Sequence, residues 1–230
     1  MRAIAIAFLC STAAWAQEPP AMTATYVEGM VTASGTPVLE GDALHEGNVV
    51  VTQPGARMEI SLSTGSVIRL GESSRMTLGN VQPGKSFSAK LFLGNLWTKV
   101  HKLLSAETFH IETENGVAGV RGTEFRVEAA EGKEDVVRVY EGVVEVRGHD
   151  GKWMHHLEPG NELRFHRDRP PAGPRAFDRA SDSGDKFMHW VRSRPKEPRQ
   201  MHPPVKREEQ KREEQKHEEK EKPREKRKNH

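Results

Sequence analysis

The sequence has almost no cysteine: Cys10 is the single thiol in 230 residues. One thiol cannot form an internal disulfide, and it cannot supply the several cysteines of a structural zinc or iron–sulfur site. Cysteine nucleophiles are excluded too if the N-terminal segment that contains Cys10 is removed. A body of about 150 residues can still bury enough apolar surface to fold without disulfides.

Long apolar runs are also missing. The run at residues 3–10 is far shorter than the stretch of about 20 residues that crosses a bilayer. Arg2 precedes it and small residues at 14–16 end it, which is the pattern of a secretory signal peptide. We therefore expect a signal peptide over residues 1–16, cleavage before Gln17 and no transmembrane span. The mature protein is expected in the periplasm, with secretion as the alternative.

The formal net charge of only +2 conceals an uneven distribution. Residues 194–230 contain 14 Lys/Arg and 9 Asp/Glu, whereas residues 17–193 carry a small acidic excess. A five-residue K-R-E-E-Q repeat in the tail has no apolar face, so it does not predict a coiled coil. We expect a solvated tail, either helical or disordered, and its contact with anionic surfaces is the alternative. The near-neutral total does not favour a nucleic-acid partner.

Short runs of alternating apolar and polar residues fill the chain from Thr25 to Phe165. Such runs indicate strands with one face buried, and Gly, Asn and Pro punctuate them at spacings typical of all-β proteins. The ambiguous stretch 91–104 is interpreted as strand and then loop. We therefore predict an all-β domain over residues 17–167, folded as a compact β-sandwich or roll of many short strands.

A different pattern follows this domain. Three prolines within residues 170–174 indicate a linker that cannot continue a sheet. Beyond it, Phe187, Trp190 and Val191 fall on one face of a short helix that begins after a cluster of Ser and Asp. We expect residues 168–193 to form a linker and one short amphipathic helix docked on the body. A helix that binds a partner is the alternative.

Two motifs go beyond a generic β pattern. The first is G-V-A-G-V-R-G-T-E-F-R-V at residues 116–127, and the second is V-Y-E-G-V-V-E-V at residues 139–146. With weaker elements upstream, they resemble the FecR domain over residues 40–147. The resemblance implies an all-β fold, a periplasmic location and a role in protein binding and signalling rather than catalysis.

The resemblance also has departures. FecR proteins that regulate sigma factors carry a cytoplasmic anti-sigma segment and a membrane span before this module, and a receptor-contacting module after it. This sequence shows neither pattern. We therefore expect a stand-alone exported module of the cell envelope that binds a protein, with binding of a cell-wall polysaccharide, or surface attachment, as the alternative.

The motif residues are Arg121, Gly122, Thr123, Glu124 and Phe125, together with Glu141 and Gly142. Arg121 is interpreted as an internal brace that donates hydrogen bonds to turn carbonyls or a carboxylate such as Glu124. The alternative is an exposed arginine that recognises an anionic ligand. The Glu141-Gly142 pair predicts a hairpin turn.

No catalytic, phosphate-binding or cofactor motif occurs, so neither an enzyme nor a cofactor is predicted. The adjacent pair His155 and His156 would point to opposite faces of a strand, which does not suit a metal site. Three further groups of residues were considered as binding or catalytic candidates. Carboxylates at 124, 128 and 145 are compatible with a hydrolase but are typical of a solvated strand face. Candidate contacts for a glycan or partner are Trp97, Trp153 and Trp190, and core packing is their alternative.

Overall fold

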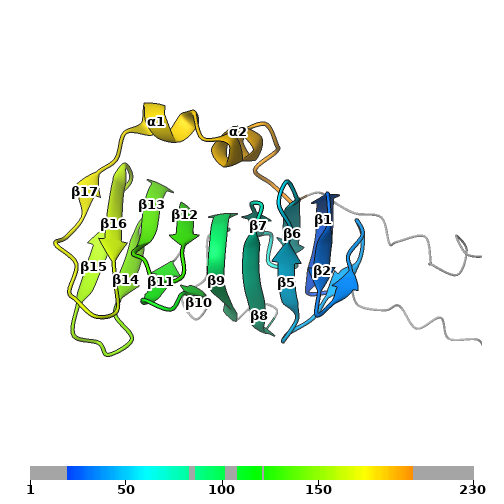
Figure 1. The fold of residues 1–230 in the computed structure, drawn as a ribbon, viewed down its shortest axis with the longest axis horizontal. Coiled ribbons are helices and arrows are strands. Elements are labelled where there is room, and N and C mark those ends of the chain that lie inside the picture. The colour runs from blue at the N-terminus through cyan, green and yellow to red at the C-terminus, as the bar shows by residue number, and fades with distance from the viewer. Residues whose placement is uncertain (1–19, 83–85, 102–107, 121, 199–230) are drawn as a thin grey trace, which may run out of the picture.

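The structure, a computed structural model, describes residues 20–82, 86–101, 108–120 and 122–198. Within these ranges the chain forms two β-sheets and two short helices (Figure 1). The predicted signal peptide, nearly all of the charged tail and Arg121 lie outside the described residues. No helix in the described part of the chain has the length and apolar character needed to cross a bilayer.

The first sheet, which we call sheet A, is antiparallel throughout. In spatial order its strands are β4 (Ala43–Leu44), β1 (Met22–Glu28), β6 (Arg57–Leu62), β7 (Val67–Leu70), the second half of β9 (Ser86–Lys99), β12 (Glu124–Ala129), β13 (Asp135–Glu141), β16 (Asn161–Phe165) and β17 (Arg175–Ala176).

The second sheet, sheet B, contains one parallel pair, β9 with β10. In spatial order its strands are β3 (Thr36–Pro37), β2 (Val31–Ala33), β5 (Val49–Thr52), β8 (Ser74–Gln82), the first half of β9, β10 (Thr108–Glu112), β11 (Val117–Val120), β14 (Val144–Arg147) and β15 (Met154–Leu157).

Strand β9 belongs to both sheets. Its first half pairs with β8 and β10 in sheet B, and its second half pairs with β7 and β12 in sheet A. The change occurs at Gly94, which has a φ of +102°. A Cβ atom there would lie 2.6 Å from the Cα atom of Ser74, so the crossing requires glycine. One continuous strand thereby ties the two sheets together.

The core lies between the sheets, where alternate side chains of each strand point inward. Sheet A contributes residues such as Leu96 and Phe125, and sheet B contributes residues such as Phe109 and Ile111. All four are essentially inaccessible to solvent. This arrangement confirms the predicted all-β fold, and β9 confirms the predicted strand at the start of residues 91–104.

The predicted hairpin at Glu141-Gly142 is wrong in its pairing. Strand β13, which ends there, pairs with β12 and β16 in sheet A. Strand β14, which begins after it, pairs with β11 and β15 in sheet B. The turn therefore carries the chain from one sheet to the other. Glycine and a polar residue signal a reversal of direction, but they do not specify which strands pair afterwards.

Two helices stand where one was predicted: α1 (Arg179–Ser183) and α2 (Lys186–Arg192). Asp178 caps the first and Asp185 caps the second, with its carboxylate accepting from two backbone amides of the next turn. Gly184 ends α1 between them. The second cap explains the break, because an N-cap residue needs extended rather than helical backbone angles.

The helices dock on the body, as predicted. Phe187, Trp190 and Val191 of α2 are buried with Val67 and Trp97, on the outer face of sheet A. We call residues 177–198 the strap. Figure 1 shows its helices running across the strands from the β16 end of the fold towards β7.

Candidate functional site

One row of side chains crosses the outer face of sheet A, beneath the strap. In the strand pairing each member lies directly opposite the next, from β6 through to β17. We call it the cross-strand row, and its members are Glu59, Arg69, Trp97, Arg126, Arg138, Glu162 and Arg175. Most of them are buried, and every member except Trp97 is charged. A buried charged row of this kind requires paired partners, because unpaired ions are costly to desolvate.

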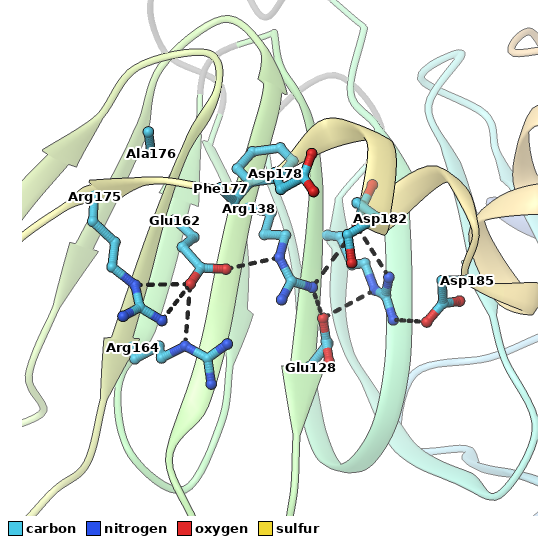
Figure 2. A pocket seen from close by; sticks show the side chains of 12 residues that line it. Glu128, Arg138, Glu162, Arg164, Arg175, Ala176, Phe177, Asp178, Asp182 and Asp185 are labelled. Atoms are coloured by element: carbon cyan, nitrogen blue, oxygen red, sulfur yellow. Dashed lines mark hydrogen bonds and ion pairs between the residues drawn. The ribbon is translucent and has the colours of Figure 1, made fainter.

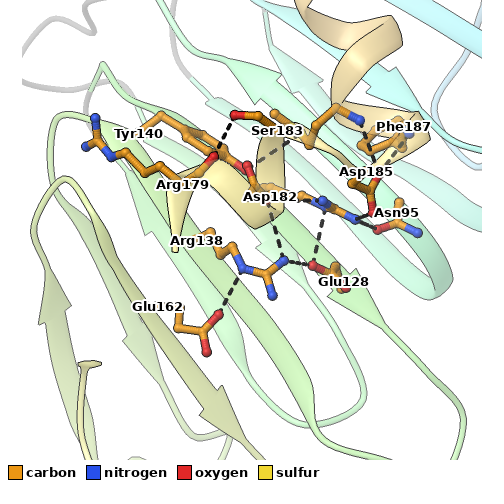
Figure 3. Close-up of polar contacts among 12 residues, drawn as sticks. Asn95, Glu128, Arg138, Tyr140, Glu162, Arg179, Asp182, Ser183, Asp185 and Phe187 are labelled. Carbon is orange, nitrogen blue, oxygen red and sulfur yellow. Dashed lines mark hydrogen bonds and ion pairs between the residues drawn. The ribbon is translucent and has the colours of Figure 1, made fainter. Parts of the chain in front are cut away.

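The middle of the row is neutralised by the strap. The Asp182 carboxylate lies 3.3 Å from Arg126 Nη1 and 3.8 Å from Arg138 Nη1, and it accepts a hydrogen bond of 3.0 Å from the Tyr140 hydroxyl (Figure 3). Asp185 adds a second carboxylate 3.2 Å from Arg126 Nη2. Burial, followed by the charge of Asp182, raises the pKa of Tyr140, so this hydroxyl stays a hydrogen-bond donor.

Arg69 holds the other end of the strap. Its side chain is fully buried, and Nε donates to Glu59 at 2.8 Å. Its terminal nitrogens donate to the backbone carbonyls of Val191 (2.7 Å) and Pro195. The guanidinium also stacks over the Trp97 ring at 4.7 Å. Burial lowers the pKa of Arg69, and the Glu59 carboxylate acts against that shift.

The opposite end of the row centres on Glu162, whose side chain is 4% exposed. One carboxylate oxygen accepts from Arg138 at 2.9 Å, and the other accepts from Arg164 at 3.1 Å and Arg175 at 2.8 Å (Figure 2). Burial raises the pKa of Glu162, but the hydrogen bonds and charges of the arginines outweigh it and bring the pKa below its ordinary value.

A hollow of about 450 Å³ lies between this part of the row and the strap. Four of its carboxylates are paired with arginine, namely Glu128, Glu162, Asp182 and Asp185. The fifth, Asp178, caps α1 through the amide of Ala180. A general acid at neutral pH needs a carboxyl group with a raised pKa. Glu162 and Asp185 have lowered pKa values instead, so neither fits that role.

The family-motif residues lie elsewhere. Glu124 is buried and its carboxylate lies 2.6 Å from Nζ of Lys196 in the strap and 3.8 Å from Nζ of Lys99. Phe125 is part of the core and packs edge-on against Phe109. Thr123, which precedes Glu124 and Phe125 in the sequence, is also buried. Glu124 therefore has lysine partners, and the predicted role of Arg121 as a brace stays a prediction.

Gly122 and Gly142 meet where the two motifs approach each other. Both have positive φ, +76° and +79°. A Cβ atom on Gly142 would lie 2.7 Å from Thr123 Cγ2 and 2.8 Å from the Gly122 carbonyl oxygen. Glu141, beside it, pairs with Lys99 at the surface. These motif residues thus shape the crossing between the sheets.

The candidate tryptophans are mostly closed to a ligand. Trp97 is 0% exposed and Trp190 is 6% exposed, because the strap covers one and contains the other. Neither presents the open ring face that stacking on a sugar needs, which corrects their assignment as glycan contacts. Trp153 is partly buried against Phe165, with ring centroids 5.6 Å apart.

The carboxylates considered for hydrolysis do not come together as one site. Glu124 and Glu128 are on β12 in sheet A, whereas Glu145 is on β14 in sheet B. Glu145 lies 3.5 Å from His156 at the surface. Within the described ranges, no three His, Cys, Asp or Glu side chains gather so as to hold a metal ion.

The cross-strand row was missed by sequence reasoning, although a signal for it exists. Arg69, Arg126 and Arg138 each sit between two apolar residues of a strand, at the positions that alternation assigns to the outer face. Three arginines on outer positions of strands, followed by a helical segment with Asp182 and Asp185, could have indicated a covered ionic face.

The fold and the row define a two-sheet β-module with a charged, largely covered face on sheet A. Residues 48–145 match the family model described as FecR protein, and this match spans β5 to β14. The match confirms the predicted resemblance of this part of the chain to the FecR domain.

One solved structure supports the similarity of the fold. A crystal structure of a protein provisionally named an anti-sigma factor, from Parabacteroides distasonis ATCC 8503, aligns with a TM-score of 0.52 and 17% identity. The alignment covers 62% of this chain and 64% of that one, so this chain spans less than two thirds of its length. Another crystal structure with the same description and organism has a TM-score of 0.49 and 18% identity, covering 56% and 58%. Comparison with curated proteins finds no match.

Proposed function

We propose that this chain is an exported, non-enzymatic FecR-type module of the cell envelope that recognises a protein partner in signal transduction. The FecR match and the anti-sigma description of the similar structures support a role in signalling. The N-terminal pattern of residues 1–16 supports export.

The observation that carries the binding role is the pairing of four carboxylates in the hollow with arginines. Glu162 and Asp185 both have lowered pKa values, because arginine hydrogen bonds and charge outweigh the effect of burial. Neither can hold a proton at neutral pH for delivery to a substrate. An array of fixed charges still gives specificity and a favourable association rate with a complementary protein surface.

The polysaccharide alternative has lost most of its support. It depended on exposed aromatic rings, and Trp97 is completely buried. Trp153 is the remaining candidate, and its ring is partly buried by packing on Phe165.

Export and partner binding are tested together by expressing the full chain in a diderm bacterium. N-terminal sequencing of the protein from the periplasmic fraction should begin at Gln17. Chemical cross-linking in the intact envelope should then give a defined protein adduct. An unrelated exported β-protein is the control, and it should not give this adduct. Retention in the cytosol, or sedimentation with purified peptidoglycan that Trp153→Ala abolishes, would contradict the proposal.

A further inference from the structure

The arginines of sheet A extend beyond the acidic groups of the strap. Arg69, Arg126 and Arg138 lie beneath the strap, and their side chains are at most 15% exposed. Arg164 and Arg175, on β16 and β17, are 43% and 62% exposed. The charged face therefore has a closed part and an open end.

The open end holds more guanidinium than carboxylate. Glu162 is shared by Arg138, Arg164 and Arg175, and it has only two oxygens. A guanidinium has five N–H donors. Arg164 donates to Glu162 through Nε, and Figure 2 shows its terminal nitrogens pointing away from that carboxylate. Arg175 approaches the same oxygen from the neighbouring strand. The two side chains thus present donors to solvent from adjacent, fixed positions.

Two hollows meet at these side chains. Arg164 and Arg175 line both the hollow beneath α1 and a second one of about 380 Å³, bounded by the proline-rich loop 170–174. Arg169 and His166 also line the second hollow, and its one lining carboxylate, Glu134, is paired with Arg169. An acidic chain segment could therefore occupy either hollow and reach both exposed arginines.

The molecule itself shows what binds to this face. The strap docks by placing Asp182 and Asp185 against Arg126, within hydrogen-bonding distance. Planar guanidinium and carboxylate groups match in geometry as well as in charge. The same chemistry is available one strand further along, but there Glu162 alone provides the carboxylate for both exposed arginines.

We propose that Arg164 and Arg175 form a docking site for the carboxylate side chains of an acidic segment in a partner protein. This inference rests on the proposed function and specifies the chemistry of the partner. In the strap, Asp182 and Asp185 neutralise the arginines of β12 and β13. The carboxylates of the partner segment do the same for Arg164 and Arg175.

The test uses the full chain and a fluorescent hexaglutamate peptide carrying a photo-cross-linker. Fluorescence anisotropy is measured at low ionic strength and at about 0.15 M salt, where the Debye length is about 8 Å. The variant is Arg164→Ala/Arg175→Ala. The matched control is Arg75→Ala/Arg147→Ala, which removes two exposed arginines from sheet B. All of these proteins keep the same basic tail, so its nonspecific binding cancels in the comparison.

The variant should bind hexaglutamate at least about ten-fold more weakly than the wild type, because each lost charge-assisted hydrogen bond contributes strongly to affinity. The control should stay within about two-fold. Cross-links in the wild type should map to residues 162–179. Arg164→Lys/Arg175→Lys keeps the charge but not the planar fork, and intermediate binding is expected if the fold is intact by circular dichroism.

Equal losses in the variant and the control, or cross-links confined to the tail, would overturn the inference. Full displacement of the peptide by inorganic phosphate, at concentrations where chloride has no effect, would also overturn it in favour of a small-oxyanion site. A partner cross-linked in the envelope by both the wild type and the double variant would leave the proposed function standing and reject this docking site. No partner with either protein would reject the proposed function itself.

Discussion

Arg126 and Arg138 lie directly opposite each other on β12 and β13, with the carboxylate of Asp182 close to both guanidinium groups. Like charges in facing positions of two antiparallel strands destabilise a sheet. The pair is tolerated because a helix outside the sheet brings a buried carboxylate to both arginines. The strap is therefore an electrostatic component of sheet A as well as its cover.

Replacing Asp182 with asparagine should destabilise the protein by about 2 kcal/mol, because two arginines then face each other with less compensation. Asparagine keeps the size of the side chain, and Glu128 and Glu162 still contact Arg138. Urea unfolding followed by tryptophan fluorescence measures the change. Asp178→Asn is the control, since the exposed cap is retained and the effect should be within about 0.5 kcal/mol. Equal stabilities of the two variants would contradict this account.

Asp185→Asn should make stability less dependent on pH. Burial raises the pKa of Asp185, but the Arg126 charge and the amides of Met188 and Phe187 lower it further, so the net shift is downward. A lowered folded-state pKa stabilises the fold above the ordinary value of 3.8 and loses that contribution as the pH falls through the folded value. The variant keeps an N-cap side chain.

At pH 7 this variant should lose about 0.5 kcal/mol, a small value because the carboxylate is 39% exposed and water screens the pair. The difference from wild type should vanish in strong acid. Unfolding curves at a series of pH values test this, and a deficit that persists in acid would show a loss of capping instead of charge.

Asp135→Asn should have the opposite pH dependence. Asp135 is 2% exposed, and burial raises its pKa despite hydrogen bonds from Thr113 and Asn115. Its Oδ2 atom has no hydrogen-bond partner among the described residues. A raised folded-state pKa favours folding below the ordinary value and loses that contribution as the pH rises through the folded value. The variant should therefore be more stable than wild type at pH 7, by about 1 kcal/mol, and lose this advantage in acid. Thermal unfolding at pH 7 and in acid measures the difference in stability between the variant and the wild type, and its sign at pH 7 tests the prediction.

Gly142→Ala should be strongly destabilising. Its positive φ and the 2.7 Å approach to Thr123 combine backbone strain with a steric clash at the crossing between the sheets. We expect a loss of more than about 2 kcal/mol in chemical unfolding. Gly132→Ala is the matched control, because its φ is +65° but no atom lies within 4 Å of the added Cβ. Gly132→Ala should lower the stability by about 1 kcal/mol. Similar losses in the two variants would show that the positive φ alone, and not the steric clash, causes the destabilisation.

The strands and the docked helix could be predicted because both depend on local periodicity. Alternation around Ile60, Val127 and Val137 shows which side chains point inward, whatever strand lies next to them. The helix face of Phe187, Trp190 and Val191 follows from a spacing of three and four residues. The motifs that resemble the FecR domain then narrowed the choice among all-β folds.

The sequence carries a signal for outward-facing arginines, but their alignment in one cross-strand row could not be predicted, because it depends on the order and register of distant strands. Arg69 faces Trp97 only because β9 leaves sheet B at Gly94 and enters sheet A. The same unknown register produced the error at Glu141-Gly142, where a turn signal was interpreted as a hairpin. Burial of Trp97 likewise depends on a strap that arrives nearly a hundred residues later in the chain.

Arg69 should hold the strap in place as well as pair with Glu59, and two variants separate these roles. Arg69→Met leaves Glu59 buried and frees the carbonyls of Val191 and Pro195. Glu59→Gln removes the charge of the carboxylate but keeps those two carbonyl bonds. Each variant should lose about 3 kcal/mol of stability, because a buried ion pair is broken. Glu59→Gln weakens the ion pair with Arg194, which follows α2, but only Arg69→Met removes the hydrogen bond to the Val191 carbonyl within α2. Only Arg69→Met should therefore accelerate amide hydrogen exchange in α2. Similar exchange in both variants, measured by mass spectrometry under native conditions, would mean that apolar packing of Trp190 and Val191 alone anchors the strap.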